Sequence, residues 1–169
     1  MNEKTLKIGG VFTYSHIRDG KIIDTWEEPN IVVDEGLNYT LDAAFSAATP
    51  ITAWYIGIFK NNYTPLASDV ALTFPGVGVA NEATTEYSEA TRPAWAEAGV
   101  AAKVITNTAS PAVFTFASGV NIYGAFLASI NTKAGTTGKL GAASKFASVR
   151  AMIAADILSV TYSLTISSV

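Results

Sequence analysis

Apolar and small polar residues alternate almost without a break from Asp156 to Val169. A period of two is that of a β-strand, in which successive side chains point to opposite faces of the sheet. The positions between the apolar ones are all Ser or Thr, so one face is apolar and the other is polar. We therefore expect a long strand with one buried face, in a chain built mainly from sheets. The residues of the apolar face are Leu158, Val160, Tyr162, Leu164 and Ile166.

The first thirty residues predict a β-hairpin. Strand-like sequence from Leu6 to Ile17 leads into Asp19-Gly20, and a second strand-like run follows from Ile22 to Glu28. Asp-Gly between two such runs favours a tight hairpin, because both residues tolerate positive φ angles. Residues 1–29 are expected to form this hairpin, either as an arm that lies across a neighbour or as part of the core, and Gly9-Gly10 to mark a bulge or kink.

One short helix is expected near residues 34–46. Asp34 is placed to cap the first turn, and Glu35 lies where the helix dipole favours an acid. Apolar residues then recur at helical spacing, which predicts that one face packs on the core. The residues of this face are Leu37, Leu41, Ala44 and Phe45.

The remaining chain predicts an all-β domain over residues 30–169. The run from Thr52 to Phe59 is apolar on both faces, as in a central strand. Residues 66–100 are irregular and longer than an ordinary loop, with a short strand near 85–88. We expect a two-sheet antiparallel β-sandwich, jelly-roll-like, with the N-terminal hairpin beside it. The other expected strands are residues 103–106, 112–117, 121–129 and 140–146, with 148–155 ambiguous.

Composition narrows the possible partners. Hydrophobic residues make up 49% of the sequence and charged residues 15%, which is below the roughly 25% of an average domain. Such a neutral surface suits packing against other protein, including copies of the same chain. The net charge of −3 offers no basic face for nucleic acid. No apolar run is long enough for a membrane-spanning helix, and the absence of cysteine excludes disulfides and thiolate ligands.

The sequence predicts no catalytic, metal-binding or cofactor-binding site, and hence no enzyme. His16 is the only histidine, and we interpret it as structural. A glycan hydrolase needs a pair of carboxyl groups. The candidates for such a pair are Glu82, Glu86 and Glu89, which lie in the irregular stretch. We expect them to be solvated loop residues, with hydrolysis the most remote alternative.

Four residues are candidates for a protein interface: Trp26 on the hairpin, and Tyr87, Arg92 and Trp95 in the irregular stretch. Tryptophan, tyrosine and arginine are enriched among the interface residues that contribute most of the binding energy. Exposed tryptophans also suit sugars, so a carbohydrate site stays an alternative for Trp26 and Trp95.

Four segments together resemble small virion structural proteins of tailed bacteriophages. The segments are Asn30–Asp42, Thr52–Pro65, Thr85–Trp95 and Ile122–Leu127. The resemblance implies a head decoration, or capsid cement, protein that binds the outside of the major capsid protein shell. It also implies a homotrimer, made in the host cytoplasm and located in the virion. A receptor- or glycan-binding module of a tail or fibre is the alternative.

Overall fold

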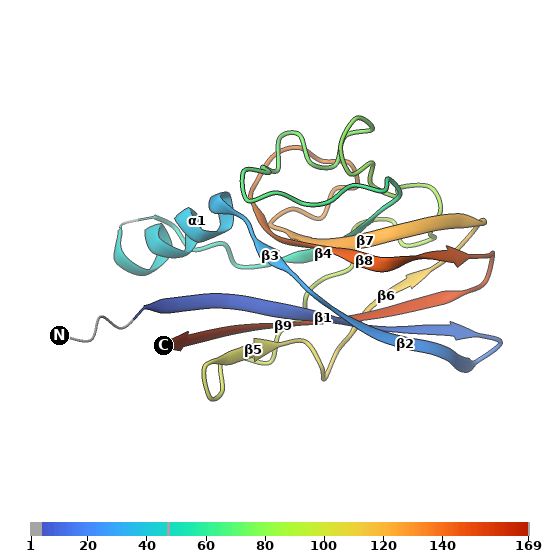
Figure 1. Cartoon of the computed structure of the whole chain (residues 1–169), viewed down its shortest axis with the longest axis horizontal. Coiled ribbons are helices and arrows are strands. Elements are labelled where there is room, and N and C mark those ends of the chain that lie inside the picture. Colours follow the sequence, from blue (N-terminus) through green and yellow to red (C-terminus); the bar gives the residue numbers. More distant parts are fainter. Residues whose placement is uncertain (1–4, 47, 169) are drawn as a thin grey trace.

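The computed structural model describes residues 5–46 and 48–168. Two antiparallel β-sheets pack face to face, and one helix lies at one end of the sandwich (Figure 1). The larger sheet has the order β2-β1-β9-β5, with β6 also pairing with β9, and the smaller has the order β3-β8-β7-β4. The predicted sandwich with one helix and an N-terminal hairpin is confirmed. The elements are β1 (Leu6–Arg18), β2 (Lys21–Pro29), β3 (Ile31–Val32), α1 (Asp34–Phe45), β4 (Tyr55–Phe59), β5 (Val104–Thr106), β6 (Ala112–Thr115), β7 (Val120–Ala128), β8 (Leu140–Met152) and β9 (Ile157–Ser168).

Strand β9 is central to the larger sheet, and its predicted apolar face is fully buried in its first half, whereas Leu164 and Ile166 are half-buried. It pairs with β1 on one side and with β5 and β6 on the other. Leu158, Val160 and Tyr162 are fully buried between the sheets. The alternation of apolar and polar residues therefore predicts which face of β9 points into the core.

The N-terminal hairpin forms as predicted, but β1 is an inner strand of the larger sheet and not a separate arm. Its residues 6–17 pair continuously with β9, and Phe12 and Tyr14 are fully buried. Asp19 and Gly20 adopt the expected positive φ angles of 50° and 73° at the turn. The kink expected at Gly9-Gly10 is absent from the β1–β9 register, and the irregularity lies between His16 and Ile17, opposite β2.

Gly10 is required by close packing. A Cβ atom at this position would lie 2.7 Å from a ring carbon of Tyr162 and 2.5 Å from the carbonyl oxygen of Ser163. The Tyr162 ring also stacks on Phe12, with centroids 4.2 Å apart. Glycine at this position therefore lets the Tyr162 ring lie flat on β1.

The helix forms at the predicted residues, but its expected packing is wrong. Its N-cap is Val33, with no side-chain cap, so Asp34 does not cap it. Gly36 is the only buried residue of α1, whereas Leu41 is 56% exposed and Phe45 is 87% exposed. In Figure 1, α1 lies beyond the end of the smaller sheet, above the ends of β1 and β9.

Strand β8 is longer than the sequence suggests. The weak strand expected at residues 140–146 and the ambiguous stretch after it form one strand of 13 residues. Its pairing with β7 jumps from Gly124↔Lys145 to Ile122↔Arg150, which leaves extra residues on β8. The Glu28 carboxylate accepts a hydrogen bond of 2.7 Å from the backbone N–H of Ala147 within this bulge. A side chain of the opposite sheet thus accepts a hydrogen bond from a backbone N–H of the bulge.

The long irregular segment between β4 and β5 covers the outer face of the smaller sheet, so β4 and most of β7 are buried on both faces (Figure 1). Ile56 and Ile58 of β4 face the core between the sheets, whereas Phe59 packs under the segment with Phe74 and Phe126. The prediction of a strand covered on both faces is confirmed, and so is the irregular character of residues 66–100. The short strand expected near Tyr87 is reduced to a single bridge with Phe116.

Candidate functional site

Three of the four predicted interface residues lie inside the chain. Tyr87 is 2% exposed, Arg92 1% and Trp95 7%, so their side chains offer almost no surface to a partner. The indole N–H of Trp95 donates a 3.0 Å hydrogen bond to the carbonyl of Tyr162. The structure therefore uses these residues for packing within the chain.

Trp26 is half-buried on β2 and separate from the other three. Its ring stacks on Tyr14 with centroids 5.0 Å apart, and the Arg150 guanidinium lies 4.2 Å from its centroid. Arg150 in turn donates a 2.6 Å hydrogen bond to Asp24. The four predicted residues are thus distributed over separate places and form no common site.

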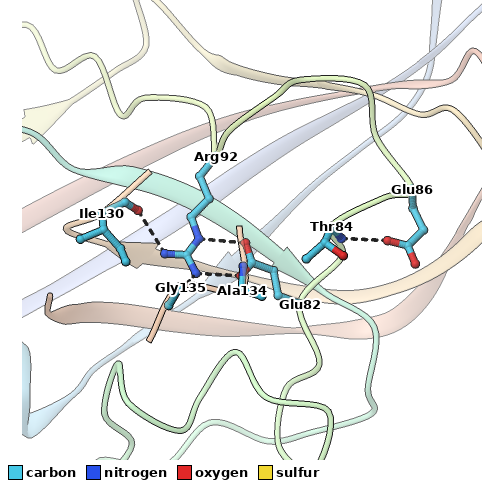
Figure 2. Close-up of polar contacts among 7 residues, drawn as sticks. All are labelled: Glu82, Thr84, Glu86, Arg92, Ile130, Ala134 and Gly135. Carbon is cyan, nitrogen blue, oxygen red and sulfur yellow. Dashed lines mark hydrogen bonds and ion pairs between the residues drawn. The ribbon is translucent and has the colours of Figure 1, made fainter. Parts of the chain in front are cut away.

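Arg92 and Glu82 form a buried ion pair that the sequence does not predict (Figure 2). The guanidinium donates to both carboxylate oxygens, from Nε at 2.8 Å and from Nη2 at 2.7 Å. It also donates to the carbonyls of Ile130 and Gly135 at 3.0 and 3.2 Å. The Glu82 carboxylate accepts a further bond from the N–H of Ala134 at 2.7 Å. The buried charges are thus paired, and their other hydrogen bonds go to backbone groups of the loop between β7 and β8. The ion pair therefore holds the irregular segment against that loop.

Glu86 and Lys133 extend this connection. Lys60 donates a 2.7 Å hydrogen bond to Glu86. The backbone N–H of Thr84 also donates to Glu86, at 2.8 Å, as Figure 2 shows. Burial raises the pKa of Glu86, but these hydrogen bonds outweigh it and lower that pKa overall. Lys133 donates to the carbonyls of Thr84 and Tyr87, and burial lowers its pKa. Lys133 therefore joins the loop between β7 and β8 to the long irregular segment, whereas Glu86 joins that segment to Lys60 at the end of β4.

The three glutamates considered for hydrolysis therefore have structural partners. Glu82 holds Arg92, Glu86 holds Lys60, and Glu89 accepts two hydrogen bonds of 3.1 and 3.0 Å from the N–H of Thr115. Each carboxylate is engaged by a different neighbour. The expectation that they are solvated is wrong for Glu82, which is 2% exposed.

His16 contacts a single buried carboxylate. Its Nε2 lies 2.8 Å from Oδ2 of Asp156, and Arg18 donates to the same carboxylate through Nε and Nη2, both at 2.7 Å. The N–H of Ile153 donates to Asp156 at 2.9 Å. The Arg18 hydrogen bond is the main reason that the pKa of Asp156 is held well below its usual range. The cluster fixes the turn between β8 and β9 onto the N-terminal hairpin.

The hollowed surface of the molecule lies around α1. An apolar cavity of about 310 Å³ lies between the sheets at this end, with Trp54, Trp95 and Tyr162 among its walls. A groove of about 730 Å³ runs between α1 and the start of β1. It is lined by residues 6–11 on β1, by Leu37 and Leu41 on α1, and by Thr165 and Ser167 on β9.

Exposed apolar side chains gather at the same end. Leu6 is 62% exposed, Leu41 56% and Phe45 87%. We call these three residues the helix-end surface. The sequence contains the relevant pattern, an amphipathic helix, but a periodic apolar face does not reveal whether the same chain covers it. This surface, with the groove beside it, is the candidate functional site.

Residues 5–46 and 48–168 lack two kinds of feature. No helix there is long and apolar enough to cross a membrane. No group of three or more His, Asp or Glu side chains in these ranges is placed to hold a metal ion.

No protein-family model matches the sequence, and no curated protein sequence matches it significantly.

Proposed function

We propose that this chain is a non-enzymatic structural protein of a bacteriophage particle, which binds the outside of the major capsid shell and stabilises it. The helix-end surface carries this proposal. It places three large apolar side chains in solvent at one end of a sandwich whose loops are held by buried ion pairs. Exposed apolar groups gathered on a rigid support are typical of a protein interface.

Two further observations support the proposal. The sequence segments that resemble tailed-phage head proteins include Asn30–Asp42, which contains most of the groove-facing part of α1. The low charged fraction of 15% also favours broad contact with protein. Binding to the shell would stabilise both partners by mass action, because only folded chains bind. In this proposal the chain acts as a homotrimer and is located in the virion after synthesis in the host cytoplasm.

The experiment is a binding assay with undecorated shells. Purified chain is mixed with shells assembled from the major capsid protein, the shells are sedimented, and the bound chain is quantified. Phe45→Ser should weaken binding at least about tenfold, since a buried aromatic anchor contributes well over 1.4 kcal/mol. Val77→Ser is the matched control, because Val77 is 82% exposed but lies outside the helix-end surface.

Two outcomes would contradict the proposal. One is absence of the chain from purified particles by mass spectrometry, and the other is equal shell binding by the wild type and Phe45→Ser. Analytical ultracentrifugation tests the trimer separately, since a monomer at micromolar concentration would remove that part alone.

A glycan- or receptor-binding module of a tail or fibre is the second candidate. The apolar cavity favours it, because Trp54, Trp95 and Tyr162 supply the aromatic walls common in small-ligand sites. A glycan-array signal lost in Trp54→Ala but retained in Trp26→Ala would support this candidate. The control is apt because Trp26 does not line the cavity.

A further inference from the structure

Part of β1 has a free edge. Residues 6–10 pair with β9 on one side, but β2 pairs with β1 only from Val11 onward, opposite Pro29. Beyond that point the chain turns away to β3, after the N–H of Asn30 donates a 3.2 Å hydrogen bond to the carbonyl of Gly10. The strand therefore continues past its neighbour with one side uncovered.

The direction of the backbone groups on this edge follows from the Asn30 contact. In a β-strand the N–H and C=O of one residue point to the same side, and the side alternates from residue to residue. Because the carbonyl of Gly10 points toward Asn30, the backbone groups of Ile8 and Leu6 point toward the same open side. Among the described residues, no hydrogen bond outside the β1–β9 ladder involves the backbone of Ile8 or Leu6.

The open edge faces the 730 Å³ groove, and α1 forms the opposite wall. Leu37 and Leu41 line that wall, so an added strand would meet backbone donors and acceptors on one side and apolar side chains on the other. Unpaired strand edges are templates for a further strand. The geometry thus suits an extended peptide better than a compact small molecule.

We propose that this groove binds one extended peptide arm of the major capsid protein, which adds to β1 as a sixth strand of the five-stranded sheet. The identity of the partner rests on the proposed function. A free arm is favoured over the edge of a second folded copy, because only residues 6–10 of this edge are open and β2 occupies the same side of β1 from Val11 onward. So short an open stretch suits one extended segment.

The lining also specifies the chemistry of the arm. The wall formed by Leu37 and Leu41 requires apolar residues at alternate positions of the peptide. Lys7 is the only charged residue in the groove and forms no ion pair within residues 5–46 and 48–168. An acidic residue opposite Lys7 would form a favourable cross-strand pair. The bound segment is thus apolar in alternation, with an acidic residue on its other face.

The test uses overlapping synthetic peptides that cover the major capsid protein, each labelled for fluorescence anisotropy. The wild-type chain should bind only the peptides that come from one extended arm of the major capsid protein. Ile8→Pro should weaken that binding about tenfold relative to Ile8→Ala, because proline removes the outward N–H but no donor of the β1–β9 ladder. Lys7→Glu should weaken binding of the peptides that carry the acidic residue.

A second measurement on the wild type guards against misfolding of the proline variant. Hydrogen exchange at the amide of Ile8 should slow on addition of the bound peptide, whereas exchange at Val77 should not change. Failure of every peptide to bind, or equal affinity of Ile8→Pro and Ile8→Ala, would overturn the inference. So would self-association that Ile8→Pro abolishes, because a second copy would then occupy the groove. Shell binding that persists without peptide binding leaves the proposed function intact and rejects only the groove.

Discussion

The Arg92 guanidinium and the Glu82 carboxylate face each other through two hydrogen bonds of 2.8 and 2.7 Å, with both side chains at most 1% exposed. The residues are ten positions apart within the irregular segment. Through Ile130 and Ala134 the pair also holds the loop between β7 and β8. One ion pair thus organises the two loops that cover the smaller sheet.

Removing one member of this pair should be strongly destabilising. Glu82→Gln leaves a buried guanidinium without its counter-charge, and we expect a loss of about 3–5 kcal/mol in the free energy of unfolding. Urea denaturation followed by circular dichroism measures it. Lys139→Ala is the control, since its ion pair with Glu35 spans 3.7 Å and its side chain is 47% exposed. That change should cost at most about 0.5 kcal/mol, and a similar cost for both variants would contradict the prediction.

The contact between α1 and β8 depends on Gly36. A Cβ at this position would run into the backbone carbonyl of Gly141, which cannot rotate away as a side chain can. We therefore expect Gly36→Ala to lower the midpoint of thermal unfolding, although alanine favours a helix by about 1 kcal/mol over glycine. Gly78→Ala is the matched control, because nothing lies within 4 Å of its added Cβ. A Gly36→Ala variant as stable as the wild type would show that α1 can shift freely.

Stability at low pH should depend on Asp156. Arg18 holds the pKa of this carboxyl below its unfolded-state value of about 3.9, so the carboxylate stabilises the folded chain fully above that value. The contribution declines as the pH falls through the folded-state pKa. The difference in unfolding free energy between wild type and Asp156→Asn should therefore shrink as the pH drops below about 4. Urea titrations at several pH values measure it, and a constant difference would refute the prediction.

At high pH the corresponding group is Tyr63. Burial, followed by the 2.7 Å hydrogen bond to Asp69, raises its pKa to about 12. Because the folded-state value exceeds the unfolded value of about 10, this tyrosine stabilises the fold below pH 10 and loses that effect as the pH rises through 12. Tyr63→Phe should remove the tyrosinate absorbance step near pH 12. Persistence of that step would assign it to another tyrosine.

Local patterns explain which parts of the fold the sequence predicts. The β9 strand and the Asp19-Gly20 turn depend mainly on residues close together in the sequence, so both predictions are confirmed. The position of β1 within the sheet is not local, because it depends on pairing with a strand far along the chain. The sequence therefore leaves open whether the hairpin is an arm or part of the core, and the pairing with β9 makes β1 part of the core.

The candidate site was harder to predict because burial depends on distant segments. Trp95 in an irregular stretch can fill a core or meet a partner, and only the position of Tyr162 decides that it fills the core. Likewise, the apolar face of α1 is visible in the sequence, but its exposure follows from where the smaller sheet ends. No sequence motif marks the Glu82–Arg92 pair. Ala134, whose backbone N–H also bonds to Glu82, is 52 positions away from it.

The pairing of β1 with β9 has a consequence for biosynthesis. His16 and Asp156, which meet at one end of this pairing, are 140 positions apart. On the ribosome, β1 must therefore wait with Phe12 and Tyr14 unprotected until β9 has emerged. Closing so large a loop makes the nascent chain dependent on slow, non-local contacts. Products of interrupted translation would keep a sticky apolar strand, and they are natural targets for chaperones and proteases.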